Sequence, residues 1–367
     1  MNNILFIGND DWYIKSHRQD LLLKTKLHFS KVGLLTNISN RIKFPNSLKV
    51  FDWEMNKKSI NFFKVIFEIK KIFEVIKKFQ PNLIHCIGMK PIILMSILNF
   101  LIDKKTVYAF TGFGILDSKY SIKYKLMKGI FFFIFVNLIK NKSFKIIVQN
   151  KENRNYLINS GISKKKISLI PGTGFNFNQK IKPRSYKRKI ILLAGRLLWS
   201  KGVKEFIKCS KSRLLNSYKI KFLLIGDPDL GSTDAVPSDY LKSNINRNFV
   251  WLNKQKSLNK YFKKSYLFLY PSTYGEGTPR VLLESFKFSV PVIAFRNPGC
   301  NDIIKNNVNG FLIEPKNTDK IIKKITYLLE NKIKRDKLGS NAYEYVKKNF
   351  SNQKIFLNTF KVWKDLL

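Results

Sequence analysis

The sequence predicts an α/β protein made of two doubly wound domains that face each other across a cleft, each with a parallel sheet. Three observations indicate this class. The chain has 367 residues, which at about 150 residues per domain suggests two domains. Short apolar runs alternate with helical patterns, as expected of βα units. A second such series starts after a stretch rich in Lys, Arg and Pro, which we interpret as a linker.

The predicted strands follow in two groups. Those of the first half lie at residues 4–7, 82–86, 105–110, 144–148 and 167–170, and those of the second half at 190–194, 221–225, 249–252, 266–270, 290–295 and 311–313. We therefore predict an N-terminal Rossmann-like domain over 1–178, a linker over 179–189 and a C-terminal Rossmann-like domain over 190–350. A C-terminal helix over 351–367 can pack back on the first domain.

The charge of the chain is unusual. Lys and Arg number 68 against 24 Asp and Glu, a formal net charge of +44, and 57 of the 68 cations are Lys. Such a surface favours phosphates, nucleic acids or anionic lipid headgroups. A/T-rich codons also add Lys, so the charge is either an adaptation to a membrane surface or a compositional bias. At 44% hydrophobic residues, the chain is not intrinsically disordered.

The cysteines and the N-terminus indicate a cytoplasmic setting. Cys86, Cys209 and Cys300 lie far apart, which excludes a disulfide framework and a clustered metal site of cysteines. The first residues carry no charged region or cleavage signature, so we expect no signal peptide.

Three apolar segments bear on membrane contact. Residues 91–102 and 129–139 are shorter than the ~20 residues needed to span a bilayer. We favour buried helices of the core for them, and the alternative is a segment at the membrane interface. Residues 61–79 combine an apolar stripe at helical spacing with five Lys. This helix either lies on an anionic membrane or faces the core with its basic side solvated.

Four motifs in the second half each follow a predicted strand. The first contains Gly195 and Arg196, with Lys201 five residues later. Glycine lets a backbone approach a phosphate closely, and an Arg–Lys pair can clamp a diphosphate. Taken alone the motif is weak, because in so basic a chain such a pair is more often solvated surface. The second motif, at Gly226, is a strand end with a turn.

The third motif is the most specific, because acids are scarce in this chain. Glu276 and Glu284 flank a Gly-Thr-Pro loop in which Pro279 suits a first helical turn. Glu276 is then expected beside free N–H groups at a helix N-terminus. The alternative is an N-terminal helix charge plus a surface acid. In the fourth motif, 297–302, we interpret Cys300 as a packing residue.

These motifs, in this order and spacing, resemble those of the GT-B glycosyltransferases of family 4, particularly the bacterial capsular and O-antigen branch. The resemblance covers nearly the whole chain. Its carriers are Gly195-Arg196-Leu197, Lys201-Gly202, Gly226, Glu276 to Glu284, Pro298-Gly299-Cys300, Asn309-Gly310-Phe311-Leu312, Ser16-His17-Arg18, Thr111-Gly112-Phe113-Gly114, Gln149-Asn150 and Gly172-Thr173-Gly174.

The resemblance implies a role for each matching residue. Arg196 and Lys201 would hold the donor diphosphate and neutralise the leaving group. Glu284 would accept hydrogen bonds from the ribose, and Glu276 would lie beside the transferred sugar. The remaining nucleotide-sugar-binding positions are Gly195, Gly226, Arg280 and the backbone N–H groups of Gly277 and Thr278. His17, Arg18, Thr111 and Gly112 form the implied acceptor side.

The chain departs from the family pattern in its N-terminal half. Loop 110–114 offers Thr111 where family members often have a His, so we assign no catalytic base. His17 is either structural or close to the active site. The first loop has a single glycine, Gly8, where the wider family commonly has two. Because this loop is expected to face the acceptor, the identity of the acceptor stays undefined. Asp227 and Asp229 have the spacing of a metal clip, but in this position we expect neither metal nor cofactor.

The resulting hypothesis is a retaining glycosyltransferase that uses a nucleotide diphosphate sugar, UDP-linked, and a polyprenyl-diphosphate-linked saccharide acceptor. The donor chemistry calls for positive charge and N–H dipoles around the leaving diphosphate. We expect a peripheral location on the cytoplasmic membrane face, against an anionic surface, and no nucleic-acid partner. The alternatives are a UDP-sugar epimerase of the same fold and a non-enzymatic basic protein that binds membranes or nucleic acids.

Overall fold

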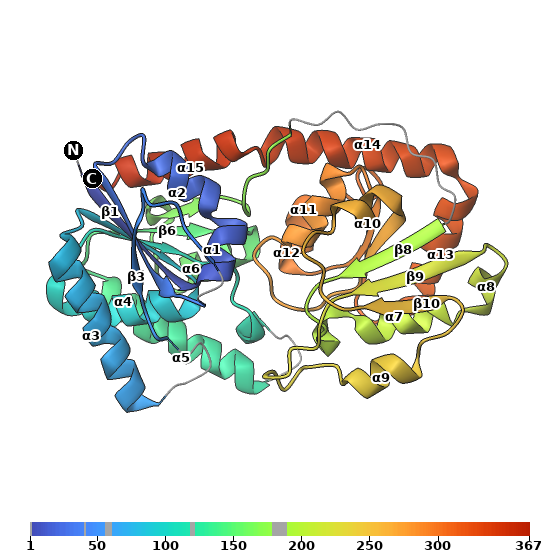
Figure 1. Cartoon of the computed structure of the whole chain (residues 1–367), viewed down its shortest axis with the longest axis horizontal. Helices are drawn as coiled ribbons and strands as arrows, with labels where there is room; N and C mark the ends of the chain where they lie inside the picture. Colours follow the sequence, from blue (N-terminus) through green and yellow to red (C-terminus); the bar gives the residue numbers. More distant parts are fainter. Residues whose placement is uncertain (1, 40–41, 56–60, 118–121, 178–188) are drawn as a thin grey trace. The chain divides into compact units, whose positions relative to one another are not determined.

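The computed structural model describes residues 2–39, 42–55, 61–117, 122–177 and 189–367. The chain forms two compact units (Figure 1). Unit 1 comprises Met1–Phe175, Glu276–Thr278 and Asn352–Leu367, and unit 2 comprises Asn176–Gly275 and Pro279–Ser351. Of the predicted linker 179–189, only Lys189 lies within the described residues. Unit 1 thus takes in the C-terminal segment and a tripeptide from the third motif.

Unit 1 contains a seven-stranded parallel sheet of order β3-β2-β1-β4-β5-β6-β7. Its strands are β1 (Asn3–Asp10), β2 (Lys31–Asn37), β3 (Lys49–Asp52), β4 (Leu83–Ile87), β5 (Thr106–Ala109), β6 (Phe144–Val148) and β7 (Ile167–Leu169). Five of these strands were predicted, and β2 and β3 were missed. The parallel sheet confirms the predicted class for this unit.

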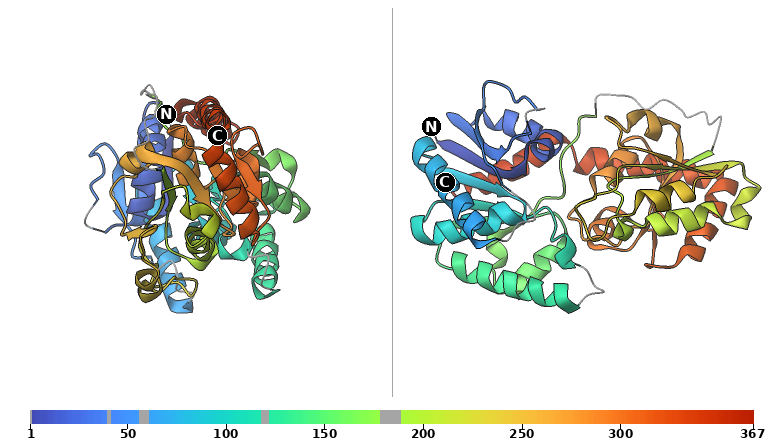
Figure 2. Two further views of the ribbon diagram at one scale, coloured as in Figure 1. Left: turned by 90° about the vertical axis from the view of Figure 1, so that its right-hand side faces the viewer. Right: turned by 60° about the horizontal axis from the view of Figure 1, so that its bottom comes forward.

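Helices cover both faces of this sheet. They are α1 (Asp11–His17), α2 (Gln19–Thr25), α3 (Phe62–Phe79), α4 (Met89–Ile102), α5 (Ile122–Ile139), α6 (Lys151–Asn159) and α15 (Asn352–Lys364), with 3₁₀ turns η1 (Ile115–Asp117) and η2 (Lys164–Lys166). The neighbouring helices α3, α4 and α5 share one core with α6 (Figure 2). Helices α1, α2 and α15 share the core on the other face. 

The C-terminal helix α15 is held to the sheet of unit 1 by a buried hydrogen bond. Trp363 is fully buried, and its indole Nε1–H donates to Nδ1 of His85 on β4 at 2.9 Å. Burial, and secondly the charge of Arg18, lower the pKa of His85 to about 3. His85 is therefore neutral at pH 7 and carries its proton on Nε2.

The apolar stripe of α3 faces the core along most of its length. Ile72 and Ile76 are buried, and Val65, Ile69 and Phe73 pack against the same cluster. Of the two readings of this helix, the structure thus supports a core-facing helix for these residues. No helix in the described ranges combines the length and the apolar character needed to cross a bilayer.

Unit 2 contains a six-stranded parallel sheet of order β10-β9-β8-β11-β12-β13, and every strand was predicted. Its strands are β8 (Lys189–Ala194), β9 (Ile220–Ile225), β10 (Phe249–Leu252), β11 (Ser265–Tyr270), β12 (Val292–Phe295) and β13 (Phe311–Ile313). Its helices are α7 (Val203–Ser210), α8 (Arg213–Asn216), α9 (Ser238–Ser243), α10 (Asn259–Lys264), α11 (Arg280–Lys287), α12 (Pro298–Ile303), α13 (Thr318–Glu330) and α14 (Lys332–Asn349), with η3 (Trp199–Lys201).

Candidate functional site

The four motifs of the second half gather at one edge of the unit 2 sheet. They follow β8, β9, β11 and β12, which are adjacent in the order β9-β8-β11-β12. Because the four strands are parallel, their carboxyl ends lie at the same edge of the sheet. The connections diverge on either side of β8, and such a switch point is where doubly wound sheets bind ligands.

Gly195 and Gly226 touch each other at the ends of β8 and β9. The N–H of Gly195 donates to the carbonyl of Ile225 at 3.0 Å. Gly226 has φ +152°, and a Cβ added there would lie 1.8 Å from the Gly195 carbonyl oxygen. Only glycine fits this approach. The two positions therefore leave a bare backbone edge beside the cations described next.

Two cations lie close to the ring of Tyr274. The Arg196 guanidinium carbon is 5.6 Å from the ring centroid, and Nζ of Lys201 is 4.8 Å from it. Both distances lie within the range of cation–π attraction. The backbone fixes Tyr274 here, because the N–H groups of Thr273 and Tyr274 donate to the carbonyl of Ser200 at 2.8 and 3.2 Å. The structure thus brings the predicted pair together around one aromatic side chain.

Each of these cations also has a specific polar partner. Nη1 of Arg196 donates to Oδ2 of Asp229 at 2.9 Å. Partial burial lowers the pKa of Arg196, but Tyr274 and Asp229 outweigh it and raise the pKa above its ordinary value. Lys201 is buried, and its Nζ donates to the hydroxyl of Tyr270 at 3.1 Å. A buried ammonium needs such partners, so this lysine is not ordinary solvated surface.

The glutamate predicted to bind ribose lies on α11 next to an arginine. Nε of Arg280 donates to Oε1 of Glu284 at 3.0 Å, an i,i+4 pair in which both side chains are about one-quarter exposed. Burial, opposed by Glu284, lowers the pKa of the nearby Lys287. Pro279 lies at the N-cap, one residue before the predicted first turn. The exposed part of Glu284 remains accessible to a ligand.

The tripeptide Glu276–Thr278 makes its hydrogen bonds inside unit 1. The N–H of Gly277 donates to the Thr111 carbonyl at 3.0 Å, and that of Thr278 donates to Oε1 of Gln149 at 3.2 Å. Nδ2 of Asn150 donates to the carbonyls of Glu276 and Gly277, both at 3.2 Å. The N–H groups expected to point at a sugar or phosphate thus have protein acceptors here, and the helix N-terminus is not free at these positions.

The positions predicted to form the acceptor side follow β1 and β5 in unit 1. His17 stacks on Tyr13 with ring centroids 4.6 Å apart, and its Nδ1 is 2.6 Å from the Ser16 hydroxyl. Arg18 is buried at the end of α1. Thr111 and Gly112 follow β5, and Gly112 is buried. These contacts leave the two readings of His17 open.

Two residues of the unit 2 site were not predicted as members. Tyr274 stands within the third motif, two positions before Glu276, and its aromatic character was the available signal. Asp229 was weighed only as a metal ligand, whereas its carboxylate pairs with Arg196. Asp227 accepts from the Lys254 N–H at 2.9 Å. The described residues contain no group of three or more His, Cys, Asp or Glu side chains arranged for a metal ion.

The cysteines lie in the interior. Cys86, Cys209 and Cys300 are buried and reduced. Burial raises the pKa of Cys86, and it raises that of Cys209 to about 12. Such thiols are poor nucleophiles.

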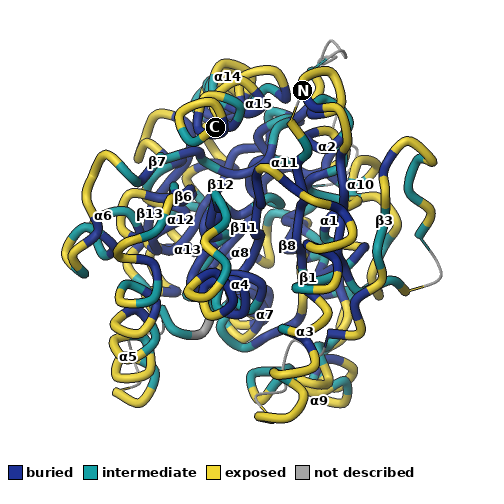
Figure 3. The backbone as a smooth tube through the Cα atoms, turned by 90° about the vertical axis from the view of Figure 1, so that its left-hand side faces the viewer, coloured by how far each residue is buried: buried dark blue, intermediate teal, exposed yellow. Residues whose placement is uncertain are grey.

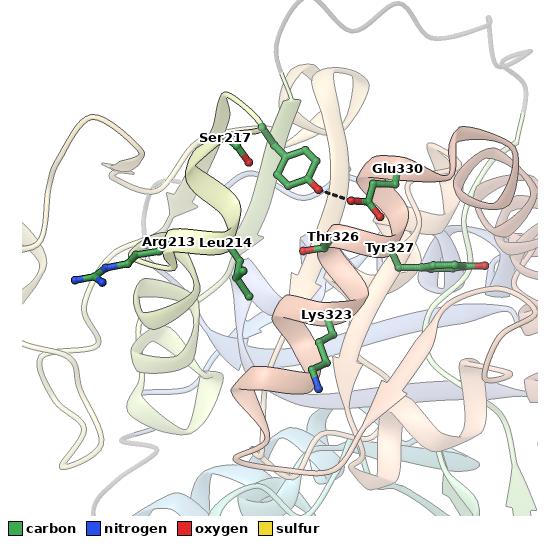
Figure 4. Close-up of a pocket in the computed structure, with 8 residues that line it drawn as sticks. Arg213, Leu214, Ser217, Lys323, Thr326, Tyr327 and Glu330 are labelled. Carbon is green, nitrogen blue, oxygen red and sulfur yellow. Dashed lines mark hydrogen bonds between the residues drawn. The ribbon is translucent and has the colours of Figure 1, made fainter.

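A hollow of about 570 Å³ lies elsewhere in unit 2, between α8 and α13. Figure 4 shows its lining, which comprises Arg213, Leu214, Ser217, Tyr218, Lys323, Thr326, Tyr327 and Glu330. The Tyr218 hydroxyl is hydrogen-bonded to Glu330 across it. Residues 217 and 218 precede β9, so the hollow is at the amino edge of the sheet. It contains none of the predicted site residues.

Comparisons with known proteins match both units. Residues 175–345 match the family model described as "Glycosyl transferases group 1", and residues 3–168 match the one described as "Glycosyl transferase 4-like". The capsular polysaccharide biosynthesis glycosyltransferase CapM of Staphylococcus aureus is 26% identical over 318 residues, which cover 82% of this chain and 81% of CapM.

Two further comparisons concern substrates and fold. The N,N'-diacetylbacillosaminyl-diphospho-undecaprenol alpha-1,3-N-acetylgalactosaminyltransferase of Campylobacter jejuni is 26% identical over 318 residues, covering 80% of each chain. The crystal structure of HepE from Anabaena in complex with UDP-glucose superposes with a TM-score of 0.77 at 18% identity and covers 100% of both chains. At that identity the match shows the fold.

Proposed function

The chain belongs to the GT-B glycosyltransferases of family 4, of the type that builds bacterial capsules and O-antigens, and from this premise we propose a specific reaction. The enzyme transfers a sugar, a hexose or N-acetylhexosamine, from a UDP-sugar to a polyprenyl-diphosphate-linked saccharide, with retention at the anomeric carbon. The observation that carries the proposal is the placement of Arg196 and Lys201 around Tyr274 at the switch point of the unit 2 sheet.

The leaving group explains why two cations are needed. When the bond between the sugar C1 and the diphosphate oxygen breaks, its electron pair stays on the diphosphate and positive charge develops on the sugar ring. Arg196 can bind phosphate oxygens through two parallel N–H groups, and Lys201 supplies a point charge. The proposal assigns neutralisation of the diphosphate to these side chains, without a metal ion or organic cofactor.

The remaining residues are assigned by what they can contact. Glu284 accepts hydrogen bonds from the ribose, Glu276 lies beside the sugar, and Gly195, Gly226 and Arg280 line the nucleotide. For the N–H groups of Gly277 and Thr278 to reach the donor, their bonds to Thr111 and Gln149 must break.

The acceptor assignment follows the named substrate of the Campylobacter relative, an undecaprenol-diphosphate-linked sugar. We assign His17, Arg18, Thr111 and Gly112 of unit 1 to the acceptor side. A lipid-linked acceptor places the enzyme peripherally on the cytoplasmic face of the membrane, with no role in nucleic-acid binding.

The test is a transfer assay with a panel of UDP-sugars and a synthetic polyprenyl-diphosphate-linked sugar, run with EDTA and read by mass spectrometry. Proton NMR of the product reports the anomeric configuration. We expect one UDP-sugar to give an α-linked product. Arg196→Ala should reduce turnover by about 10²-fold or more.

The matched control is Arg247→Ala, which removes an exposed arginine of the same unit and should leave turnover unchanged. Near-normal turnover of a folded Arg196→Ala protein overturns the assignment of the leaving-group site. A UDP-sugar epimerised at any ring carbon, in place of a transfer product, would instead identify an epimerase.

A further inference from the structure

Exposed apolar side chains gather on one helix layer of unit 1. Thirteen of the twenty-three large apolar side chains that are exposed in the described part of the chain lie on α3, α4 and α5. These helices pack side by side over one face of the sheet. Single exposed apolar side chains are ordinary, but a gathering of this kind marks an interaction surface. We call the outer side of these three helices the helix-layer face.

Helix α5 is the clearest part of the helix-layer face, because it is apolar on both sides. Phe132, Phe135 and Ile139 point into the core of unit 1. On the other side, Ile122 is 89% exposed and Phe133 is 73% exposed, and Leu126, Met127, Ile130 and Ile134 are exposed with them. Much of the α5 tube is accordingly coloured as exposed in Figure 3. A surface helix of a globular protein is normally polar on its outer side. The core therefore accounts for the apolar side chains on the inner side of α5 and not for those on its outer side.

The two readings of residues 129–139 were a buried helix and a segment at the membrane interface. The inner side of α5 is buried as the first reading predicts, whereas its outer side is exposed. The same layer also exposes Phe63 and Phe67 in the first turns of α3, and Phe100 and Leu101 at the end of α4. The exposed apolar area thus extends across all three helices.

Positive charge accompanies this area. Helix α5 contains no Asp or Glu, and Lys123 and Lys125 are exposed among its apolar side chains. Lys64 lies between Phe63 and Phe67 on α3, and Nζ of Lys142 is 5.9 Å from the ring of Phe100. Lys128 is different, because it pairs with Asp117 at 2.6 Å. The helix-layer face is therefore apolar with a basic fringe.

We propose that the helix-layer face docks on an anionic lipid bilayer. The apolar side chains of α5 enter the boundary between headgroups and acyl chains, and the lysines contact anionic headgroups. A second copy of the chain is a poorer partner, because pairing would bring the same lysines together. The proposal rests on the proposed function in that a lipid-linked acceptor brings the bilayer to the enzyme.

The experiment measures cosedimentation of the full chain with vesicles, without donor or acceptor. We expect at least tenfold stronger partitioning onto vesicles of phosphatidylcholine with 30% phosphatidylglycerol than onto phosphatidylcholine alone, and loss of that difference at high salt. The triple variant Leu126→Gln, Ile130→Gln, Phe133→Gln keeps every charge, and its partitioning should fall at least tenfold.

The matched control is Leu27→Gln, Ile333→Gln, Leu357→Gln, which removes three exposed apolar side chains that belong to none of α3, α4 and α5. Its partitioning should stay within twofold of the natural chain. If the triple variant on α5 does not fold, the single variant Phe133→Gln answers the question with an expected loss of about threefold or more.

Three results overturn the proposal. The first is equal binding of the natural chain to neutral and anionic vesicles, and the second is an equal loss of vesicle binding in the two triple variants. The third is a natural chain that forms a dimer and does not bind vesicles, combined with an α5 variant that is a monomer. UDP affinity of both variants, measured by calorimetry, should match that of the natural chain. Loss of vesicle binding with intact UDP binding separates failure of docking from failure of the proposed function.

Discussion

The guanidinium of Arg196 donates to the carboxylate of Asp229 at 2.9 Å, so the cation that we assign to the diphosphate already has an anionic partner within unit 2. The Arg196 side chain is 56% exposed and that of Asp229 is 25% exposed. Ion pairs this open to water contribute about 0–1 kcal/mol. Asp229 can therefore hold the guanidinium in place and yield it to a phosphate at small cost.

We predict that Asp229→Asn strengthens UDP binding by up to about fivefold. The substitution removes a competing carboxylate worth about 1 kcal/mol or less, and it removes repulsion between that carboxylate and the diphosphate. Calorimetry measures the effect. Asp239→Asn makes the same charge change at an exposed site of unit 2 and should have no effect. Weaker UDP binding by Asp229→Asn would mean that Asp229 positions Arg196 instead.

We predict that Tyr274 positions the two cations through its ring. Tyr274→Leu removes the ring from Arg196 and Lys201, and a partly desolvated cation–π contact is worth about 0.5–2 kcal/mol. The KM for the donor should rise by about five- to tenfold. Tyr274→Phe keeps the ring and should restore KM to within about threefold. If Tyr274→Phe raises the KM as much as Tyr274→Leu does, the hydroxyl of Tyr274 and not its ring positions the two cations.

For Glu284→Gln we predict weaker binding of the nucleotide. A hydrogen bond to a charged acceptor is worth about 1.5–3 kcal/mol, which corresponds to roughly 10- to 100-fold in affinity. Because the contact is with ribose, UDP and UMP should lose the same factor, whereas Arg196→Ala should weaken UDP more than UMP. Glu344→Gln, at an exposed site of α14, is the control. Unchanged UDP affinity would remove Glu284 from the site.

Strands β2 and β3 were not predicted, and β2 shows why a local sequence pattern is not sufficient. The run that forms β2 starts with a lysine and contains Gly33, which reads as a weak strand. In the structure a Cβ at Gly33 would lie 2.9 Å from the ring of Phe79 and 3.0 Å from Leu5. Glycine is needed because α3 and β1 pack against this point. The need for glycine at position 33 thus depends on Phe79, 46 residues later in the chain, and on Leu5, 28 residues earlier.

The candidate site was predicted where a motif follows its own strand, and missed where contacts join distant residues. Gly195, Arg196 and Gly226 lie close together because β8 and β9 are neighbours in the sheet. The alternation of strands and helices in the sequence predicts that neighbourhood. The pairing of Arg196 with Asp229, and of the Thr278 N–H with Gln149, joins loops whose paths the pattern does not specify. For a related reason the sequence left open whether residues 129–139 form a buried helix or a segment at the membrane interface. Periodicity identifies apolar residues but not whether anything covers them.

Our last prediction concerns pH and the bond that holds α15 to unit 1. The pKa of His85 is lowered to about 3 in the folded chain, against an ordinary value near 6.5. Between these values the unfolded chain binds a proton that the folded chain does not, so the free energy of unfolding rises with pH across this window and levels off above about pH 6.5. Protonation would also place a hydrogen on Nδ1 against the Trp363 N–H.

The natural chain should therefore lose about 2 kcal/mol of stability between pH 7 and pH 5 through His85, at about 1.4 kcal/mol per pH unit below 6.5. Asn at this position offers an acceptor to Trp363 without titrating, so His85→Asn should lack this loss even if it is less stable overall. Amide hydrogen exchange of β4, corrected for the intrinsic rate at each pH, measures the unfolding free energy of unit 1. Equal pH dependence in the two proteins would show that His85 is not the titrating group.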